Sequence, residues 1–273
     1  MPFITPEGEL IRRPERQKTH YFSGVAIKNL KTARILWAGE VLGKNRQGLD
    51  VWRNVSEHCL VQTAACGELA QELGLSQESR RNLELAAMGH DWDKKYQSQG
   101  LRKINGQIAS GDLSEEAGGK VKYDFFEESE EHSVNGMRER RIPEEIIRIA
   151  SADGHPALPR VMRPDCSIEE KILHYIGSIT DESRIVPLDE RVDNLERNER
   201  YKMMNEYGRQ VAWTDGRTLY EVQRAVGHQI EQELVQMLID SGNLPSQWEA
   251  RLQEKPEDLP LFIVEKIQDH YSH

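Results

Sequence analysis

Basic residues, cysteines and long apolar runs are all scarce in this sequence, and each scarcity excludes a class of protein. The 36 lysines and arginines are outnumbered by 46 acidic residues, which gives a formal net charge of −10. This balance argues against binding to duplex nucleic acid, because such binding depends on neutralising phosphates with Lys and Arg. No apolar run is longer than four residues, whereas a transmembrane helix needs about 20, so we expect no membrane span.

The three cysteines, Cys59, Cys66 and Cys166, are too few and too irregularly spaced for a disulfide framework or a thiolate zinc site. We expect Cys59 and Cys66, seven residues apart in a helical pattern, to be small buried side chains. The first residues lack the basic-then-apolar layout of a secretory signal. These features together predict a cytoplasmic protein. A chain of 273 residues is long enough to bury a substantial core.

Helical periodicity dominates after about residue 25, and strand-like alternation is almost absent. Apolar stripes predict helices near residues 30–43, 55–73, 126–140, 143–149, 168–180, 187–206 and 217–241. Gly74 is placed to end the second of these, and Ser76 to cap one more helix whose stripe reaches His90. The fold class is therefore all-α. We predict an irregular N-terminal arm (1–25), a helical core (26–206) and C-terminal helices packed on that core (207–273).

Residues 97–123 break this helical pattern. They contain five glycines and little apolar periodicity. A connection of this length is uncommon in a compact domain unless it has a function or is disordered. The segment is predicted to be a mobile loop, a lid that closes over a ligand, or an insertion.

The histidines are informative because of where they fall. His58 and His90 each lie on the apolar stripe of a predicted helix, and Asp91 follows His90 directly. An imidazole on an apolar stripe must satisfy its ring nitrogens with hydrogen bonds or with a metal ion. Either reading fits one such histidine, and the combination of the three residues favours a metal site.

The residues in question resemble a known family. The run Trp52-Arg-Asn-Val-Ser-Glu-His58, followed by Gly89-His90-Asp91-Trp-Asp-Lys94, resembles the HD-domain superfamily of metal-dependent phosphohydrolases. The resemblance covers about residues 50–195. It implies an HD-type helical bundle with terminal helical extensions, and metal ligands in the order His, His-Asp and a later Asp. It also implies that Lys94 faces phosphate.

The resemblance is looser in its second half. Members of the family that bind two metals add histidines between the doublet and the final Asp, and His132 resembles the first of them. The second falls where this chain has Asp153, with His155 two residues further on. Imidazole and carboxylate both suit a borderline metal. We favour His155, and Asp153 stays open.

The family's final Asp would fall at Gly177 in this chain. Asp181 follows four residues later, about one helical turn along and on the same face. We favour Asp181 as the replacement ligand. The alternative is that this ligand has been lost and Asp181 merely ends the helix.

The resemblance implies chemistry at one or two divalent transition-metal ions. Imidazole and carboxylate ligands suit Mn, Fe, Co, Ni or Zn better than Ca, with Mg left open. Asp91 would bridge two ions, an activated hydroxide would attack phosphorus, and Lys94 would stabilise the phosphoryl charge. Asp93 and Glu57 are candidates for orienting ligands or transferring protons. The full predicted ligand set is His58, His90, Asp91, His132, His155 and Asp181, and the basic residues Arg53, Lys95, Arg160 and Arg184 could hold the rest of a substrate.

The leading hypothesis is a hydrolase that cleaves a phosphate mono- or diester of a nucleotide or small metabolite. The expected partner is that small molecule, without duplex nucleic acid or membrane, and a homo-oligomer is left open. One alternative within the same superfamily is a diiron oxygenase that cleaves a carbon bond with dioxygen. Another is a non-catalytic binding module with a degraded site, suggested by Gly177 and Asp153, where the family pattern breaks.

Overall fold

The computed structural model describes the backbone of residues 55–181 and 184–271, and side chains over 58–181 and 184–270. Nearer the N-terminus it describes only two antiparallel strand pairs, β1 (Phe3–Ile4) with β2 (Leu10–Ile11) and β3 (Leu42–Lys44) with β4 (Asp50–Trp52). Most of the predicted arm 1–25, the helix predicted near 30–43, Arg53 and the side chain of Glu57 lie outside the described residues.

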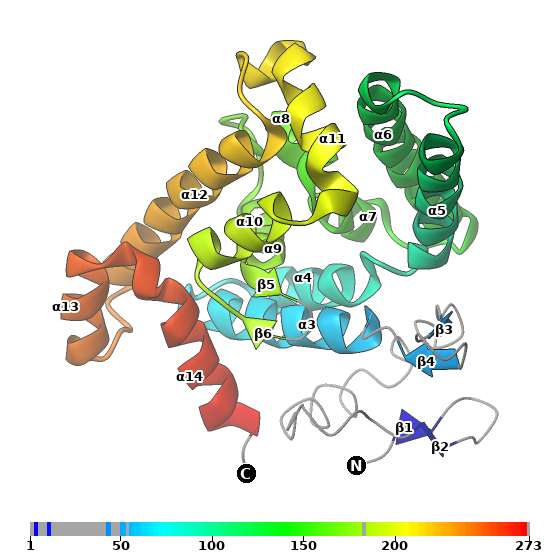
Figure 1. The fold of residues 1–273 in the computed structure, drawn as a ribbon. Helices are drawn as coiled ribbons and strands as arrows, with labels where there is room; N and C mark the ends of the chain where they lie inside the picture. Colours follow the sequence, from blue (N-terminus) through cyan, green and yellow to red (C-terminus); the bar gives the residue numbers. More distant parts are fainter. Residues whose placement is uncertain are drawn as a thin grey trace.

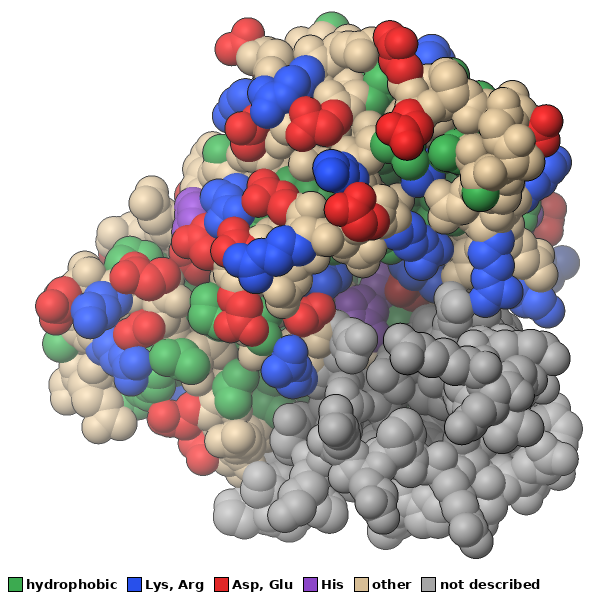
Figure 2. Space-filling model, viewed as in Figure 1, with side chains coloured by type: hydrophobic (Ala, Val, Ile, Leu, Met, Phe, Trp, Pro, Cys, Tyr) green, Lys and Arg blue, Asp and Glu red, His purple; other side chains and the backbone are tan. Residues whose placement is uncertain are grey.

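The regular secondary structure of the described residues is helical apart from these strands and one further pair, β5 (Thr180–Asp181) with β6 (Arg184–Ile185). The all-α prediction is therefore confirmed (Figure 1). Among the helices that the structure describes, none has the length and apolar character needed to cross a membrane. Acidic and basic side chains are interspersed over the described surface visible in Figure 2.

Helices α3 (Val55–Glu72) and α4 (Gln77–Gly89) pack side by side, in the lower middle of Figure 1. Gly74 separates them in a left-handed conformation (φ +68°), which glycine adopts without steric cost. The Ser76 hydroxyl caps α4 by accepting a hydrogen bond from the Ser79 N–H at 3.1 Å. Both helix boundaries were predicted. Cys59 and Cys66 are fully buried on α3, as expected.

Helix α9 (Ile168–Ile179) crosses this pair and carries the centre of the core. The Ser167 side chain and Glu170 form a reciprocal capping box that begins the helix. Its buried stripe consists of Ile172, Tyr175, Ile176 and Ile179, as the periodicity predicts. The short helix α7 (Glu144–Ala150) packs on both α4 and α9.

The prediction of a loop over residues 97–123 is wrong. This segment belongs to α5 (Lys94–Ser110) and α6 (Glu115–Glu139), which form an antiparallel pair (Figure 1). Its glycines lie mostly where other groups approach the helix. A Cβ on Gly100 would be 2.0 Å from the Phe125 ring, and one on Gly119 would be 2.6 Å from the backbone oxygen of Met203. Gly111 has the positive φ (+80°) that ends α5.

The remaining chain adds helices to the same core. They are α8 (Leu158–Val161), α10 (Leu188–Glu196), α11 (Glu199–Tyr207), α12 (Leu219–Ser241), α13 (Ser246–Glu254) and α14 (Leu259–Tyr271), with 3-10 turns η1 (His155–Ala157), η2 (Gly208–Gln210), η3 (Ala212–Thr214) and η4 (Pro256–Asp258). Val226 and Ile230 of α12 and Phe262 of α14 are buried in one hydrophobic cluster with residues of α3 and α9. The segment 207–273 therefore shares the central core.

Candidate metal centre

His90 lies where α4 ends and the chain turns towards α5. Its Nδ1 lies 2.8 Å from the carbonyl oxygen of Ala87, so Nδ1–H donates to the helix end and fixes the ring. The other nitrogen, Nε2, is buried and has no hydrogen-bond partner among the described residues. A buried polar atom without a partner is costly. A cation at Nε2 would satisfy it, and the Nδ1 contact is the kind that orients a ligand histidine.

Three side chains converge at this point. His58 from α3, His90 and Asp91 each offer a ligand atom, and these atoms all lie within 4.8 Å of one another. The two imidazole rings are 5.4 Å apart between centroids and tilted by 56°. The amide of Gln62, one turn along α3, lies 2.9 Å from Nε2 of His58. Two imidazoles and a carboxylate suit a borderline divalent metal ion, so the residues present fit such a group.

The electrostatics of the group favour an ionised Asp91. Burial opposes its charge, but Lys94, His90 and His58 outweigh burial and hold the pKa of Asp91 below its usual range. The Lys94 ammonium donates to Asp91 Oδ1 at 2.9 Å. Burial also opposes a charge on His90, but Cys59, Asp91 and Asp153 raise the pKa of His90 to about 10. A metal ion at Nε2 would therefore compete with a proton.

Asp153 occupies the space where the HD-domain resemblance places a final aspartate. It lies in the turn after α7, with Oδ2 at 3.7 Å from His90 Nε2. A Cβ on Gly177 of α9 would lie only 2.0 Å from Asp153 Oδ1. The missing side chain at position 177 is therefore what admits this carboxylate. Of the two residues left open by the sequence, Asp153 is the one in contact with His90.

Asp181, predicted to be a metal ligand, lies outside the group formed by His58, His90 and Asp91. Helix α9 ends at Ile179, and Thr180 is extended (φ −96°, ψ 111°), so Asp181 does not continue the helical face. Its carboxylate instead accepts hydrogen bonds from Arg191 at 2.7 Å and Asn194 at 3.2 Å. Arg184, predicted to bind substrate, is exposed and lies 3.5 Å from the same carboxylate.

His132 also lies apart from the group. Its Nδ1 is 2.5 Å from Asp93 Oδ2, its ring stacks on Tyr96 at 4.0 Å, and its side chain is 49% exposed. The predicted assignment of His132 as a ligand is not supported by this position. Asp93, predicted to orient a ligand histidine or to transfer a proton, contacts His132 instead.

His155 lines the same pocket as His90 and Asp91, but it is not one of the three residues whose ligand atoms converge. Gly154 has a φ of +73°, a conformation that favours glycine, and the turn directs both Asp153 and His155 to one pocket. The pocket has a volume of about 160 Å³, and the candidate ligands His90 and Asp91 line it together with Lys94. It is called the metal pocket below. The His155 ring packs edge-on against Phe126 at 4.8 Å, and its Nε2 is buried without a partner among the described side chains.

The sequence analysis missed Glu130 on α6. Its carboxylate lines the metal pocket, and burial raises its pKa to about 7, with Asp153 and Glu127 adding to the effect and Arg160 opposing it. The signal was present, because Glu130 stands between Phe126 and Val134 at four-residue spacing. A carboxylate on an apolar helical stripe is as unusual as an imidazole there.

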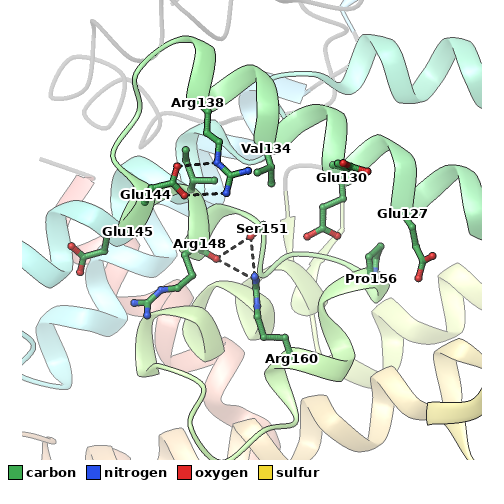
Figure 3. Close-up of a pocket in the computed structure, with 12 residues that line it drawn as sticks. Glu127, Glu130, Val134, Arg138, Glu144, Glu145, Arg148, Ser151, Pro156 and Arg160 are labelled. Atoms are coloured by element: carbon green, nitrogen blue, oxygen red, sulfur yellow. Dashed lines mark hydrogen bonds and ion pairs between the residues drawn. The ribbon is translucent and has the colours of Figure 1, made fainter.

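A second, wider cavity adjoins the metal pocket (Figure 3). Its volume is about 950 Å³, and its walls come from α6, α7 and the turn that follows α7. Arg160, predicted as a candidate substrate contact, lines it, whereas Lys95 is exposed and lines neither cavity.

Comparison of the chain with protein-family models, with curated proteins and with solved structures finds no match in any of the three. The resemblance to HD-domain proteins therefore depends on the residues quoted from the sequence alone.

Proposed function

We propose that this protein is a metal-dependent phosphohydrolase that cleaves a phosphate mono- or diester of a nucleotide or small metabolite. The observation that carries the proposal is the convergence of His58, His90 and Asp91, from two helices and the turn after the second, on one point. The buried Nε2 of His90 supports it, because this nitrogen has no hydrogen bond of normal length and the carboxylates of Asp91 and Asp153 lie 3.8 and 3.7 Å away.

His58, His90 and Asp91 would hold the metal ion, with Asp153 next to His90 as the fourth candidate. A divalent ion bound there supplies Lewis acidity towards a phosphoryl oxygen and lowers the pKa of water. The chain's own residues set the surroundings. Ala87 orients His90, and Lys94 brings a positive charge to the pocket beside Asp91, where it stabilises negative charge on phosphoryl oxygens.

The test combines metal analysis with phosphate release. The full chain is reconstituted with Mn, Fe, Co, Ni, Zn or Mg, metal content is measured, and a panel of phosphate esters is assayed with each ion. We expect stoichiometric metal and turnover of at least one ester. Lys94→Ala should retain the metal and lose activity by about tenfold or more. The neighbouring Lys95→Ala is the matched control, because Lys95 is exposed and lines neither cavity, and it should retain full activity.

Three outcomes would contradict the proposal. Failure to bind any of these ions would favour a non-catalytic binding module. Bound iron whose spectrum responds to dioxygen after anaerobic reduction, without ester cleavage, would favour an oxygenase. Equal loss of activity in Lys94→Ala and Lys95→Ala would remove the specific role of Lys94.

A further inference from the structure

The metal pocket and the wider cavity adjoin each other. Glu130, Val134, Ser151 and Pro156 line both. In Figure 3, Glu130 projects from α6 towards the side of the cavity where Ser151 and Pro156 lie. A phosphate held near His90 would therefore have its organic substituent directed into the wider cavity. The chemistry of that cavity decides which substituent fits.

The three arginines of the wide cavity share two carboxylates, Glu144 and Glu170. Arg138 donates two hydrogen bonds to Glu144, at 2.9 and 3.1 Å, as a paired fork (Figure 3). Arg160 and Arg148 share the buried carboxylate of Glu170, at 3.1 and 3.6 Å. Arg160 also donates to the Ser151 hydroxyl. These contacts leave one of the three guanidinium charges unbalanced.

Four carboxylates in the same cavity lack such neutralisation. Glu127, Glu130, Glu131 and Glu145 line it, and none forms an ion pair with a described lysine or arginine side chain. The cavity therefore carries an excess of negative charge. Glu130 stands at the junction with the metal pocket.

An independent feature of the junction is the unpartnered imidazole of His155. This side chain belongs to a residue that is only 7% exposed, it lines the pocket that contains Glu130, and its Nε2 has no partner among the described residues. Phe126 lies against this ring and lines the same pocket. An aromatic face and a carboxylate together suit an organic cation.

We infer that the wide cavity and its junction bind a positively charged organic amine, so that the substrate is the phosphate ester of an amino alcohol. The phosphate end of this inference rests on the proposed function. The amine end rests on Glu130, His155 and the excess of carboxylates. A nucleoside polyphosphate would place further negative charge among these carboxylates, so the cavity disfavours it.

The first experiment compares two esters that differ only in charge. The Mn-loaded full chain is assayed with O-phosphocholine and with 3,3-dimethylbutyl phosphate, in which carbon replaces the quaternary nitrogen. We expect kcat/KM to be at least tenfold higher for phosphocholine. Glu130→Gln should bring the ratio of the two values towards one. Glu254→Gln, an exposed glutamate on α13 that lines neither cavity, should leave the ratio unchanged.

The second experiment needs no catalysis. The full chain is titrated calorimetrically with choline chloride and with neutral 3,3-dimethylbutan-1-ol. We expect choline to bind at least tenfold more tightly than the alcohol, and Glu130→Gln to remove most of that difference. Both experiments use the wild-type ratio as the primary readout, so they do not depend on the folding of a variant.

The outcomes separate the two proposals. Equal hydrolysis of the two esters, or equal binding of choline and the neutral alcohol, overturns the inference about the amine and leaves the phosphohydrolase proposal standing. Glu130-dependent choline binding without cleavage of any ester supports the cationic site and counts against the phosphohydrolase.

Discussion

The side chain of Asp153 packs directly against the backbone of Gly177. The carboxylate of Asp153 fills the space that a side chain on Gly177 would occupy, since a Cβ there would lie 2.0 Å from Oδ1. The same carboxylate lies 3.7 Å from Nε2 of His90. A negative charge is thus placed beside the candidate ligands by the turn after α7 instead of by α9.

Gly177→Ala should therefore destabilise the protein and weaken metal binding. Alanine in a helix normally stabilises by about 0.5–1 kcal/mol relative to glycine. Here the new Cβ must displace Asp153, and we expect a net loss of about 1–3 kcal/mol. Urea unfolding and metal titration measure both effects. Gly106→Ala is the matched control, because nothing lies within 4 Å of a Cβ at that helical position. Similar stability changes at the two sites would contradict the packing of Asp153 against Gly177.

His90→Ala and Asp91→Ala should each strip the metal while leaving most of the helical content. Both residues stand at the end of α4, and their side chains supply two of the three convergent ligand atoms. Metal content after dialysis, with circular dichroism as the folding check, measures the result. His132→Ala should keep its metal, because that ring lies against Asp93 and Tyr96 outside the group. Loss of metal in His132→Ala would bring this residue back into the ligand set.

Asp181→Asn should lower stability and leave metal affinity unchanged. The substitution weakens a hydrogen-bonded pair with Arg191 at 2.7 Å and a contact with Asn194 at 3.2 Å. We expect a cost of about 1–2 kcal/mol, in the range of a charged hydrogen bond. Denaturant unfolding and metal titration of the same preparation separate the two properties. A fall in metal occupancy would restore Asp181 as a ligand.

Stability should fall as the pH drops below 6.5, in part because of His155. Burial lowers the pKa of this residue from 6.5 to about 4. Between those values the unfolded chain binds a proton that the folded chain does not bind. The contribution of His155 to the free energy of unfolding is therefore fully present above pH 6.5 and is lost as the pH falls towards 4.

His155→Gln should flatten this part of the pH profile. One proton corresponds to at most about 1.4 kcal/mol per pH unit in the slope of the unfolding free energy. Urea unfolding of wild type and variant at pH 4.5, 5.5, 6.5 and 7.5 gives the two slopes. Parallel curves would show that His155 does not titrate differently in the folded and unfolded states.

Several features of this protein could be predicted from the sequence because their signals are local. Gly74 ends α3 and Ser76 caps α4 through contacts within a few residues. The stripe positions of His58 and His90 follow from the helical period of 3.6 residues. These local rules placed His58 and His90 among the candidate ligands, and the structure brings both close to Asp91.

The tertiary structure decided the rest, because it depends on groups that are distant in the sequence. The glycines of residues 97–123 resembled those of a loop, yet Gly100 and Gly119 lie at contacts made by Phe125 and Met203 that no local pattern reveals. Likewise, Asp153 fills the space beside Gly177 although the two residues are 24 positions apart in the sequence. Sequence periodicity determines which face of a helix a residue occupies, whereas only the packing of one helix on another determines what that face meets.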